Sequence, residues 1–297
     1  MAHAGSCDVA SRKARRFTCA RKCQVRLSCA SGKVISCMPE LPEVESAAQR
    51  LRAAAVGRRI VAVRLLHPAL RRQLTRRALA SVRGARIDRV ERRGKYQVLH
   101  LDDGRTIIAH FRMSGDWDIG PSREPRPVHA RAEIILDDGM RVVLDDPRAL
   151  STLAVAQMDA EALPPIGPDP LTRAFTARTL GAALARRRGP IKPALLDQRV
   201  AAGVGNIYAS EALWRARVHP AARASELPAE AVRAIAASIR AVLRRAVGGT
   251  RYYGSGGEAR FAVYDREGEL CRRCGSSITR IVQAARSTYF CPNCQRL

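Results

Sequence analysis

Four cysteines near the C-terminus constrain the fold of this chain more than any other feature. They fall in the frame C-x2-C-x16-C-x2-C and are Cys271, Cys274, Cys291 and Cys294. Four thiolates in two tight pairs match the spacing of a structural zinc ribbon, and they leave the metal no open position for chemistry. Two disulfides or four unrelated thiols would use the same residues, but the doubled spacing favours the metal. We therefore expect one structural Zn2+ in a C-terminal zinc finger.

The charge of the chain indicates an anionic partner. Its 52 lysines and arginines face 27 acidic residues, which gives a net charge of +25 over 297 residues. Such an excess is typical of nucleic-acid binding. A membrane surface is the alternative, but no apolar run approaches the roughly 20 residues of a spanning helix. An aromatic content of 4% argues against a protein that binds single strands by stacking bases on rings.

Residues 1–37 form an N-terminal extension that differs from the rest of the chain. They hold eight basic residues, one acidic residue and five of the nine cysteines, in no metal-like frame. The extension lacks the apolar segment of a secretory signal. It is either an organelle transit peptide or upstream sequence translated from a wrongly placed start, and we favour the second. The remaining cysteines all belong to the predicted zinc site, which fits a reducing cytoplasm.

Between Arg59 and Ala156 the hydrophobic pattern has a period of two, which predicts β-strands. Asp103-Gly104 and Asp138-Gly139 each separate two apolar runs as hairpin turns do. The pattern predicts a β-sandwich or barrel with strands at 59–66, 85–91, 96–101, 106–110, 131–136, 141–144 and 152–156.

After a proline-rich linker the period changes to 3.6 residues, which predicts helices at 173–186 and 206–214 and a long helix from Pro228. The glycines of Gly203-Val204-Gly205-Asn206 stand just before a predicted helix. Such glycines let backbone approach closely, and the free amides of a helix N-terminus bind anions. An ordinary tight turn would have the same sequence. The chain is therefore predicted to be an α+β protein.

A short motif opens the segment that follows the extension. Met38-Pro39-Glu40-Leu41-Pro42-Glu43-Val44-Glu45 precedes an amphipathic helix that ends near Gly57. Prolines and acidic residues are common in a first helical turn. This motif, the segment from Gly203 to Glu211 and the four-cysteine frame nevertheless occur in the same order in one known family. From Met38 to Leu297 the chain resembles bacterial formamidopyrimidine-DNA glycosylases.

The resemblance implies how the chain is divided. It predicts a catalytic β-sandwich at 38–158, a linker at 159–171, a helix-two-turns-helix domain at 172–258 and a zinc finger at 259–297. Double-stranded DNA that contains oxidised bases would lie between the first two domains. The protein would be a cytoplasmic monomer without a membrane partner.

The resemblance also implies a set of catalytic residues. Pro39 matches the proline whose free amine attacks the sugar and forms a Schiff base once the preceding methionine is removed. Glu40 matches the acid that assists opening of the sugar ring, and Lys95 matches a lysine associated with strand cleavage. The resemblance thus implies that this chain is a glycosylase for oxidised purines that also cleaves the DNA strand.

DNA contacts follow from the same resemblance. Phosphates would be clamped by Asn206 and Arg286, and Lys192 would lie near the lesion. Met113 matches a methionine that fills the space left by the extruded base, and Leu150 stands where the family usually has phenylalanine. The other expected DNA contacts are His129, Arg148 and Arg187, the last in place of the usual lysine.

Two further departures leave the function open. Residues 250–260 are shorter than the loop that covers flipped 8-oxoguanine in the family, so we expect better processing of formamidopyrimidines. With the extension attached, the Pro39 nitrogen is part of an amide and cannot form a Schiff base. An extension that stays attached would therefore favour a second alternative, a DNA-binding protein without catalysis. The third alternative is an endonuclease VIII type of glycosylase for oxidised pyrimidines. That type usually begins with a different tetrapeptide from Pro39–Pro42, so the sequence favours the purine-lesion enzyme.

Overall fold

The computed structural model describes residues 38–72, 74–157, 163–247 and 261–297. The predicted extension 1–37, part of the predicted linker and the predicted cover segment 250–260 lie outside the described residues.

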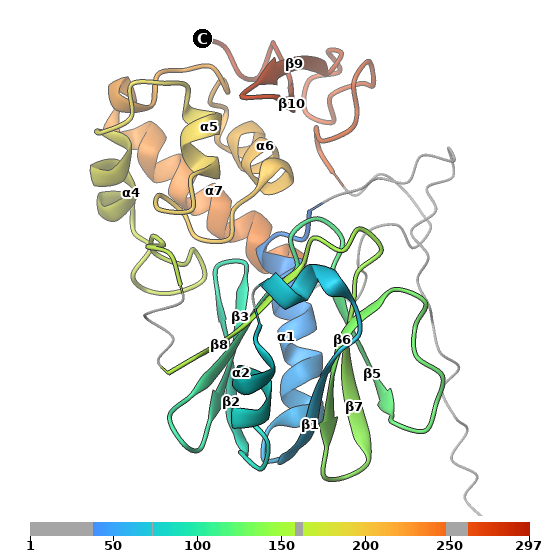
Figure 1. The fold of residues 1–297 in the computed structure, drawn as a ribbon. Helices are drawn as coiled ribbons and strands as arrows, with labels where there is room; N and C mark the ends of the chain where they lie inside the picture. Colours follow the sequence, from blue (N-terminus) through green and yellow to red (C-terminus); the bar gives the residue numbers. More distant parts are fainter. Residues whose placement is uncertain (1–37, 73, 158–162, 248–260) are drawn as a thin grey trace, which may run out of the picture.

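Two antiparallel sheets with one long helix between them form the body of the N-terminal part (Figure 1). One sheet has the order β1-β6-β7-β5, with β1 (Ile60–Leu65), β6 (Ala130–Leu136), β7 (Met140–Asp145) and β5 (Asp116–Pro121). The other has the order β2-β3-β4-β8, with β2 (Ile87–Arg93), β3 (Tyr96–Leu101), β4 (Thr106–His110) and β8 (Thr152–Ala156). Alternation along the strands turns Ile87, Leu99 and Ile134 inward, where they are buried. The predicted β-sandwich is thereby confirmed, and β3, β4 and β8 have the predicted bounds.

Helix α1 (Leu41–Ala55) runs between the two sheets and completes their core (Figure 1). Prolines suit its first turn because their fixed φ is already helical and the missing N–H is not needed there. Its apolar face buries Val44, Ala47, Leu51 and Ala55 in the sandwich core. Leu41, at the start of the same helix, is buried instead in the core of the helical part. The N-terminus of α1 therefore lies where the two parts of the molecule meet.

The helical part contains α4 (Ala177–Leu184), α5 (Ile191–Leu196), α6 (Asn206–Ala216) and α7 (Ala229–Val247). Helix α7 buries one apolar face, with Val232, Ile235, Ile239 and Leu243. Helix α6 is enclosed on more sides because α5, α7 and strand β10 all pack against it. Consequently the N-terminus of α6, with its free backbone amides, points into the protein rather than into solvent.

The C-terminal part is a small hairpin of β9 (Thr279–Gln283) and β10 (Arg286–Phe290). Ala284 and Ala285 both have positive φ, as the two central residues of a tight hairpin turn require. The hairpin leaves Arg286 exposed at the start of β10 and buries Tyr289 and Phe290 toward α6. This completes the predicted α+β fold of sandwich, helical region and zinc finger.

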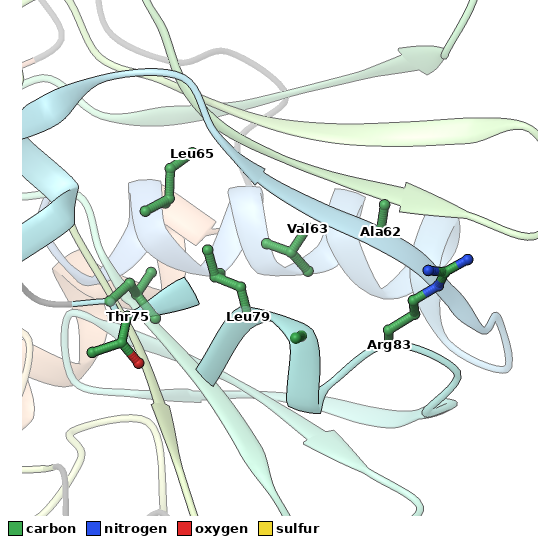
Figure 2. Close-up of a pocket in the computed structure, with 8 residues that line it drawn as sticks. Ala62, Val63, Leu65, Thr75, Leu79 and Arg83 are labelled. Carbon is green, nitrogen blue, oxygen red and sulfur yellow. The ribbon is translucent and has the colours of Figure 1, made fainter. Parts of the chain in front are cut away.

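A short 3-10 helix, Pro68–Arg72, and helix α2 (Arg76–Ser81) connect β1 to β2. A pocket of about 620 Å3 opens between β1 and α2, with the apolar side chains of Val63, Leu65 and Leu79 on its walls (Figure 2). None of the predicted catalytic or DNA-contact residues lines this pocket. In the described part of the chain, every helix is too short or too polar to cross a bilayer.

Candidate active site and DNA interface

The segment around Glu40 and Leu41 lies directly against the turn that precedes α6. The Leu41 N–H donates to the Gly203 carbonyl at 3.0 Å. A Cβ placed on Gly203 would lie 2.7 Å from the Leu41 Cβ, and a Cβ on Gly205 would collide with the Glu40 carboxyl. Both glycines are therefore required by close approach, as the sequence suggested. What approaches them is the N-terminal segment of the same chain.

Glu40 places its carboxyl group at the N-terminus of α6. Glu40 is 2% exposed, and its two oxygens accept the N–H groups of Ile207 at 2.9 Å and Tyr208 at 3.3 Å. Within this structure the group that accepts the free amides at the α6 N-terminus is thus a glutamate side chain. Burial raises the pKa of Glu40, while Lys95 and the backbone N–H groups oppose the shift. The carboxyl group therefore keeps a proton to higher pH than a free glutamate does.

A second buried carboxyl group, Glu43, supports the first. Its Oε2 accepts the Glu40 N–H at 2.9 Å and its Oε1 accepts the Tyr208 hydroxyl at 2.8 Å. Burial and the neighbouring Glu40 raise the pKa of Glu43 to about 7. Sequence analysis did not single out Glu43 or Tyr208. Only the acidic residue three positions after Glu40 gave a signal, because side chains at that spacing reach back to the N-cap.

Lys95 enters the same cluster from the turn between β2 and β3. The preceding Gly94 has φ +59, and a Cβ on it would lie 3.3 Å from Ala202, so the turn packs tightly on the segment before α6. Lys95 is buried, and burial lowers its pKa, with Glu40 opposing the shift and Arg286 adding to it. The predicted catalytic residues Glu40 and Lys95 thus interact electrostatically, and Pro39 directly precedes Glu40. Lys95 also interacts with the predicted phosphate contact Arg286.

Lys192 joins the helical part to the hairpin. Its Nζ donates to Asn206 Oδ1 at 2.6 Å, to the Ser287 carbonyl at 2.9 Å and to Thr288 Oγ1 at 2.7 Å. Burial lowers the pKa of Lys192 to about 7, with Glu40 opposing the shift and Arg286 adding to it. The Asn206 amide also donates to the Ser287 carbonyl, at 3.0 Å. Lys192 therefore fixes Asn206 beside Ser287, next to Arg286, and all three of its donors are occupied within the protein.

Four of the five remaining predicted DNA contacts lie on loops at one end of the sandwich. Met113 is half-buried in the turn after β4, and His129 is exposed just before β6. Arg148 and Leu150 are exposed in the loop after β7, where Leu150 is 45% exposed. Arg187 lies apart from these four, between α4 and α5, and its guanidinium pairs with Asp197 at 2.6 Å.

His110 connects the loops to the buried cluster. It ends β4 directly before the turn that carries Met113, and its Nδ1 accepts the Arg112 N–H at 2.9 Å. Burial lowers the pKa of His110 to about 4, and the charges of Arg112 and Lys95 add to this shift. The imidazole is therefore neutral at physiological pH, as an Nδ1 acceptor must be.

The four cysteines fit a tetrahedral metal site. Their Sγ atoms all lie within 4.8 Å of one another. The Sγ atoms of Cys271 and Cys294 are 3.9 Å apart and those of Cys274 and Cys291 are 3.4 Å apart. These separations are too long for disulfides, which need about 2.05 Å. They are close to the ~3.8 Å edge of a tetrahedron of thiolates around zinc with bonds of ~2.3 Å.

Three family models match the chain. The formamidopyrimidine-DNA glycosylase N-terminal domain matches residues 38–153, and the H2TH domain of the same enzymes matches residues 166–253. The zinc finger found in FPG and IleRS matches residues 268–297. The three matches follow the order of the sandwich, the helical part and the hairpin.

Whole proteins agree with these matches. A formamidopyrimidine-DNA glycosylase of Roseiflexus is 42% identical over 273 residues, which cover 87% of this chain and all of the relative. A relative of the same name from Streptococcus pneumoniae is 37% identical and covers 87% of this chain. MutM bound to DNA with carbocyclic 8-oxo-G has a TM-score of 0.79 at 32% identity, covering 87% of this chain and 100% of its own. Lactococcus lactis Fpg bound to DNA with Fapy-dG has a TM-score of 0.79 at 31% identity, with the same coverage. The sandwich, the helical region and the four-cysteine finger are thus shared with these proteins, and the chain belongs to the formamidopyrimidine-DNA glycosylase family.

Proposed function

We propose that the protein excises oxidised purines from double-stranded DNA and then cleaves the strand, with the amine of Pro39 as nucleophile. The observation that carries this proposal is the position of Glu40. Its buried carboxyl group, with a raised pKa, adjoins Pro39 in the chain and interacts with Lys95. A carboxylic acid of raised pKa beside a nucleophile, with a lysine of lowered pKa, is an arrangement that suits Schiff-base chemistry.

Pro39 becomes a nucleophile only when it is the first residue, because its nitrogen is otherwise part of an amide. An α-amine has a reference pKa of about 8, and a helix N-terminus and nearby cations disfavour a further positive charge. Pro39 precedes α1 by two residues, and Arg286, whose charge also acts on Lys95, supplies such a cation. The amine is therefore expected to lose its proton at a lower pH than a free α-amine does, so that attack becomes possible near neutral pH.

The reaction can be followed atom by atom. The Pro39 nitrogen attacks C1′ of the sugar as Glu40 protonates the ring oxygen and the bond from C1′ to that oxygen breaks. The bond from C1′ to the base then breaks, and the base leaves with that electron pair and with the proton that the Pro39 nitrogen gives up, which leaves an iminium ion between C1′ and Pro39. A proton is then lost from C2′ and the 3′ phosphate is eliminated, a step for which we assign the amine of Lys95 as base.

Other residues would hold the DNA. Asn206 and Arg286 would clamp phosphates, and the nearby Lys192 is proposed to contact the lesion once the complex forms. Met113 and Leu150 would fill the gap left by the extruded nucleotide, beside the backbone and base contacts of His129, Arg148 and Arg187. The chain would divide this work between domains at 38–158, 172–258 and 259–297, joined through 159–171.

Zinc would be held by Cys271, Cys274, Cys291 and Cys294. When bound it would join the two ends of the finger and take no part in catalysis, because four thiolates fill its coordination shell. Trp214 on α6 donates its indole N–H to Cys271 Sγ at 3.5 Å, so the metal site would also be fixed to the helical part. Loss of zinc is therefore expected to displace the hairpin that carries Arg286.

The choice of oxidised purines as substrate is supported by the solved relatives, whose complexes contain 8-oxo-G and Fapy-dG. Borohydride trapping tests the proposal, because borohydride reduces an iminium ion to a stable covalent link. Protein that starts at Pro39 should be trapped on DNA with an oxidised purine, and Pro39→Gly and unprocessed protein that starts at Met1 should be trapped far less. Equal trapping of the unprocessed long form would contradict the proline-amine mechanism. Trapping only on oxidised pyrimidines would favour the endonuclease VIII type instead.

A further inference from the structure

One buried carboxylate connects the loops that carry Met113, Arg148 and Leu150. Asp146 has no exposed surface, and its Oδ1 accepts the Ser114 hydroxyl at 2.5 Å and the Arg148 N–H at 3.1 Å. Its Oδ2 accepts the N–H groups of Leu150 and Ser151, each at 2.7 Å. The Ser151 hydroxyl lies 2.7 Å from the same oxygen. The carboxylate thus binds donors from two separate loops at once.

The main chain of Asp146 brings in a third loop. Its N–H donates to the carbonyl of His129 at 3.0 Å, an extension of the pairing between β6 and β7. Arg131 donates to the Asp146 carbonyl at 2.6 Å. Asp146 therefore contacts residues next to, or is itself near, each of the four residues to which we assign contacts with DNA at this end of the sandwich, Met113, His129, Arg148 and Leu150.

The two loops that share the carboxylate are both strained. Arg112, beside Met113, has φ +55, and Ala149, between Arg148 and Leu150, has φ +54. They are two of six non-glycine residues with positive φ among the described residues. Such conformations cost of order 1–3 kcal/mol and persist only when surrounding contacts enforce them. At Ala149 the enforcing contacts are those of Asp146, which binds the residues on either side of it. In the other loop His110 accepts the Arg112 N–H and Asp146 binds the serine after Met113.

The two loops also touch each other. A Cβ on Gly115 would overlap the Ser151 hydroxyl and lie 3.0 Å from the Phe111 carbonyl. The Ser151 hydroxyl is itself within 3.2 Å of that carbonyl. Burial raises the pKa of Asp146, but the hydrogen bonds from Ser114, Ser151 and Arg148 outweigh burial and leave the pKa below its usual value. Asp146 is therefore ionised at neutral pH, so every one of its oxygens acts as an acceptor.

We propose that Asp146 is a positioning residue that joins the Met113 turn and the Arg148–Leu150 loop into one preformed wedge for extruding the damaged nucleotide. The inference rests on the proposed function, because it concerns how that site opens the duplex. Without Asp146, the two loops would have to be ordered while the base leaves the stack, and this cost would be added to the cost of unstacking. The residue contacts no reacting atom and acts only through the side chains that it positions.

The proposal predicts a difference between two substrates. In Asp146→Asn the amide nitrogen replaces one acceptor oxygen, so hydrogen bonds from at least one loop are lost. Single-turnover excision of 8-oxoguanine from a matched duplex should fall on the order of 10- to 100-fold, the scale for a group misplaced by about 1 Å. Borohydride trapping on the same duplex with an abasic site should change less than about threefold, because there is no base to extrude.

Matched variants separate this effect from a loss of folding. Ser114→Ala and Ser151→Ala each remove one donor from one loop, and each should reproduce a smaller part of the same substrate difference. Asp138 is the control, because it also accepts a backbone N–H in this sheet, that of Met140 at 3.0 Å, but in the hairpin between β6 and β7. Asp138→Asn should leave both substrates unaffected. Equal losses on both substrates in Asp146→Asn, or no loss on either, would overturn the proposal.

A second measurement does not depend on catalysis. In a Pro39→Gly background, 2-aminopurine next to the lesion reports opening of the base stack by its fluorescence. Adding Asp146→Asn should slow the rise in fluorescence and lower its amplitude, whereas an unchanged rise would count against the wedge. If the proline mechanism itself is wrong, the parent protein that starts at Pro39 will show no trapping on either substrate. The fluorescence comparison would still decide the role of Asp146.

Discussion

Glu40 and Asp146 are both buried carboxyl groups that accept backbone N–H groups, yet their pKa values are shifted in opposite directions. Two N–H groups bind Glu40, and burial prevails, so its pKa is raised. Asp146 accepts hydrogen bonds from Ser114 and from the loop of residues 148–151, and they prevail over burial, so its pKa is lowered. The balance between burial and donated hydrogen bonds thus decides which carboxyl group can supply a proton and which serves as a permanent anchor.

The first way to break this comparison is to remove the proton of Glu40. Glu40→Gln keeps the shape of the side chain and one of its two acceptor oxygens, but it cannot donate a carboxylic acid proton. Base release and borohydride trapping should fall by about 10²- to 10⁴-fold, the usual contribution of a general acid. Binding to a duplex with a non-cleavable lesion analogue should remain nearly unchanged, as measured by fluorescence anisotropy. Wild-type rates of base release would refute the acid assignment.

A substitution in the hairpin should affect DNA binding and leave the chemical step unchanged. Arg286 is exposed and acts on phosphates in our proposal, so Arg286→Ala should weaken binding to damaged and undamaged duplexes alike, on the order of tenfold. The slope of log affinity against log salt should become shallower by about one unit, because one phosphate contact is lost. Arg296→Ala, which removes an exposed arginine near the C-terminus, is the control. A change confined to lesion-containing DNA would instead place Arg286 at the base.

Glu43 tests the electrostatic part of the comparison. Its pKa in the folded protein, about 7, lies above the value of an unfolded glutamate. The folded state therefore binds more protons between these values, and the stability that Glu43 contributes is complete below about pH 4.3 and is lost as the pH rises through 7. The free energy of unfolding should fall on the order of 1 kcal/mol per pH unit in that window, relative to Glu43→Gln. Denaturant titrations of both proteins at pH 5 and pH 8 measure this difference, and parallel curves would contradict it.

Sequence patterns predicted the parts of the fold that are locally encoded. Alternating apolar residues predicted most strands, and the helices that begin at Leu41 and Asn206 followed from their first-turn residues and glycines. Strand β5 (Asp116–Pro121) was missed because only Trp117 and Ile119 are apolar and it pairs on one side alone, with β7. Helices α2 and α5 were missed because each has only six residues, too few to show a helical period.

The candidate site divides in the same way. Glu40, Lys95 and the four cysteines stand in motifs whose spacing is visible in the sequence. The residues that support the site are not visible in the sequence, because their contacts are long-range. Tyr208 contacts Glu43 across 165 positions, and Lys192 contacts Thr288 across 96. Asp146 belongs to the quoted segment Asp146–Ser151, but its role depends on Ser114, 32 positions away. No pattern in one sequence indicates that these loops share an acceptor.

The smallest expected effect concerns the wedge itself. Leu150 is 45% exposed at the tip of the loop that Asp146 holds, so a larger side chain would find space there. An aromatic ring stacks on bases where leucine only excludes water, and such stacking is worth ~1–3 kcal/mol per base. Leu150→Phe should therefore speed single-turnover excision of 8-oxoguanine by roughly two- to fivefold. This gain is smaller than the full stacking energy would give, because leucine already supplies part of the contact. Trapping at an abasic site should not change. Val61→Phe is the matched control, since Val61 is 43% exposed on β1 and belongs to neither loop. A faster reaction in both variants, or a faster reaction at the abasic site, would show that the gain does not come from extrusion of the base.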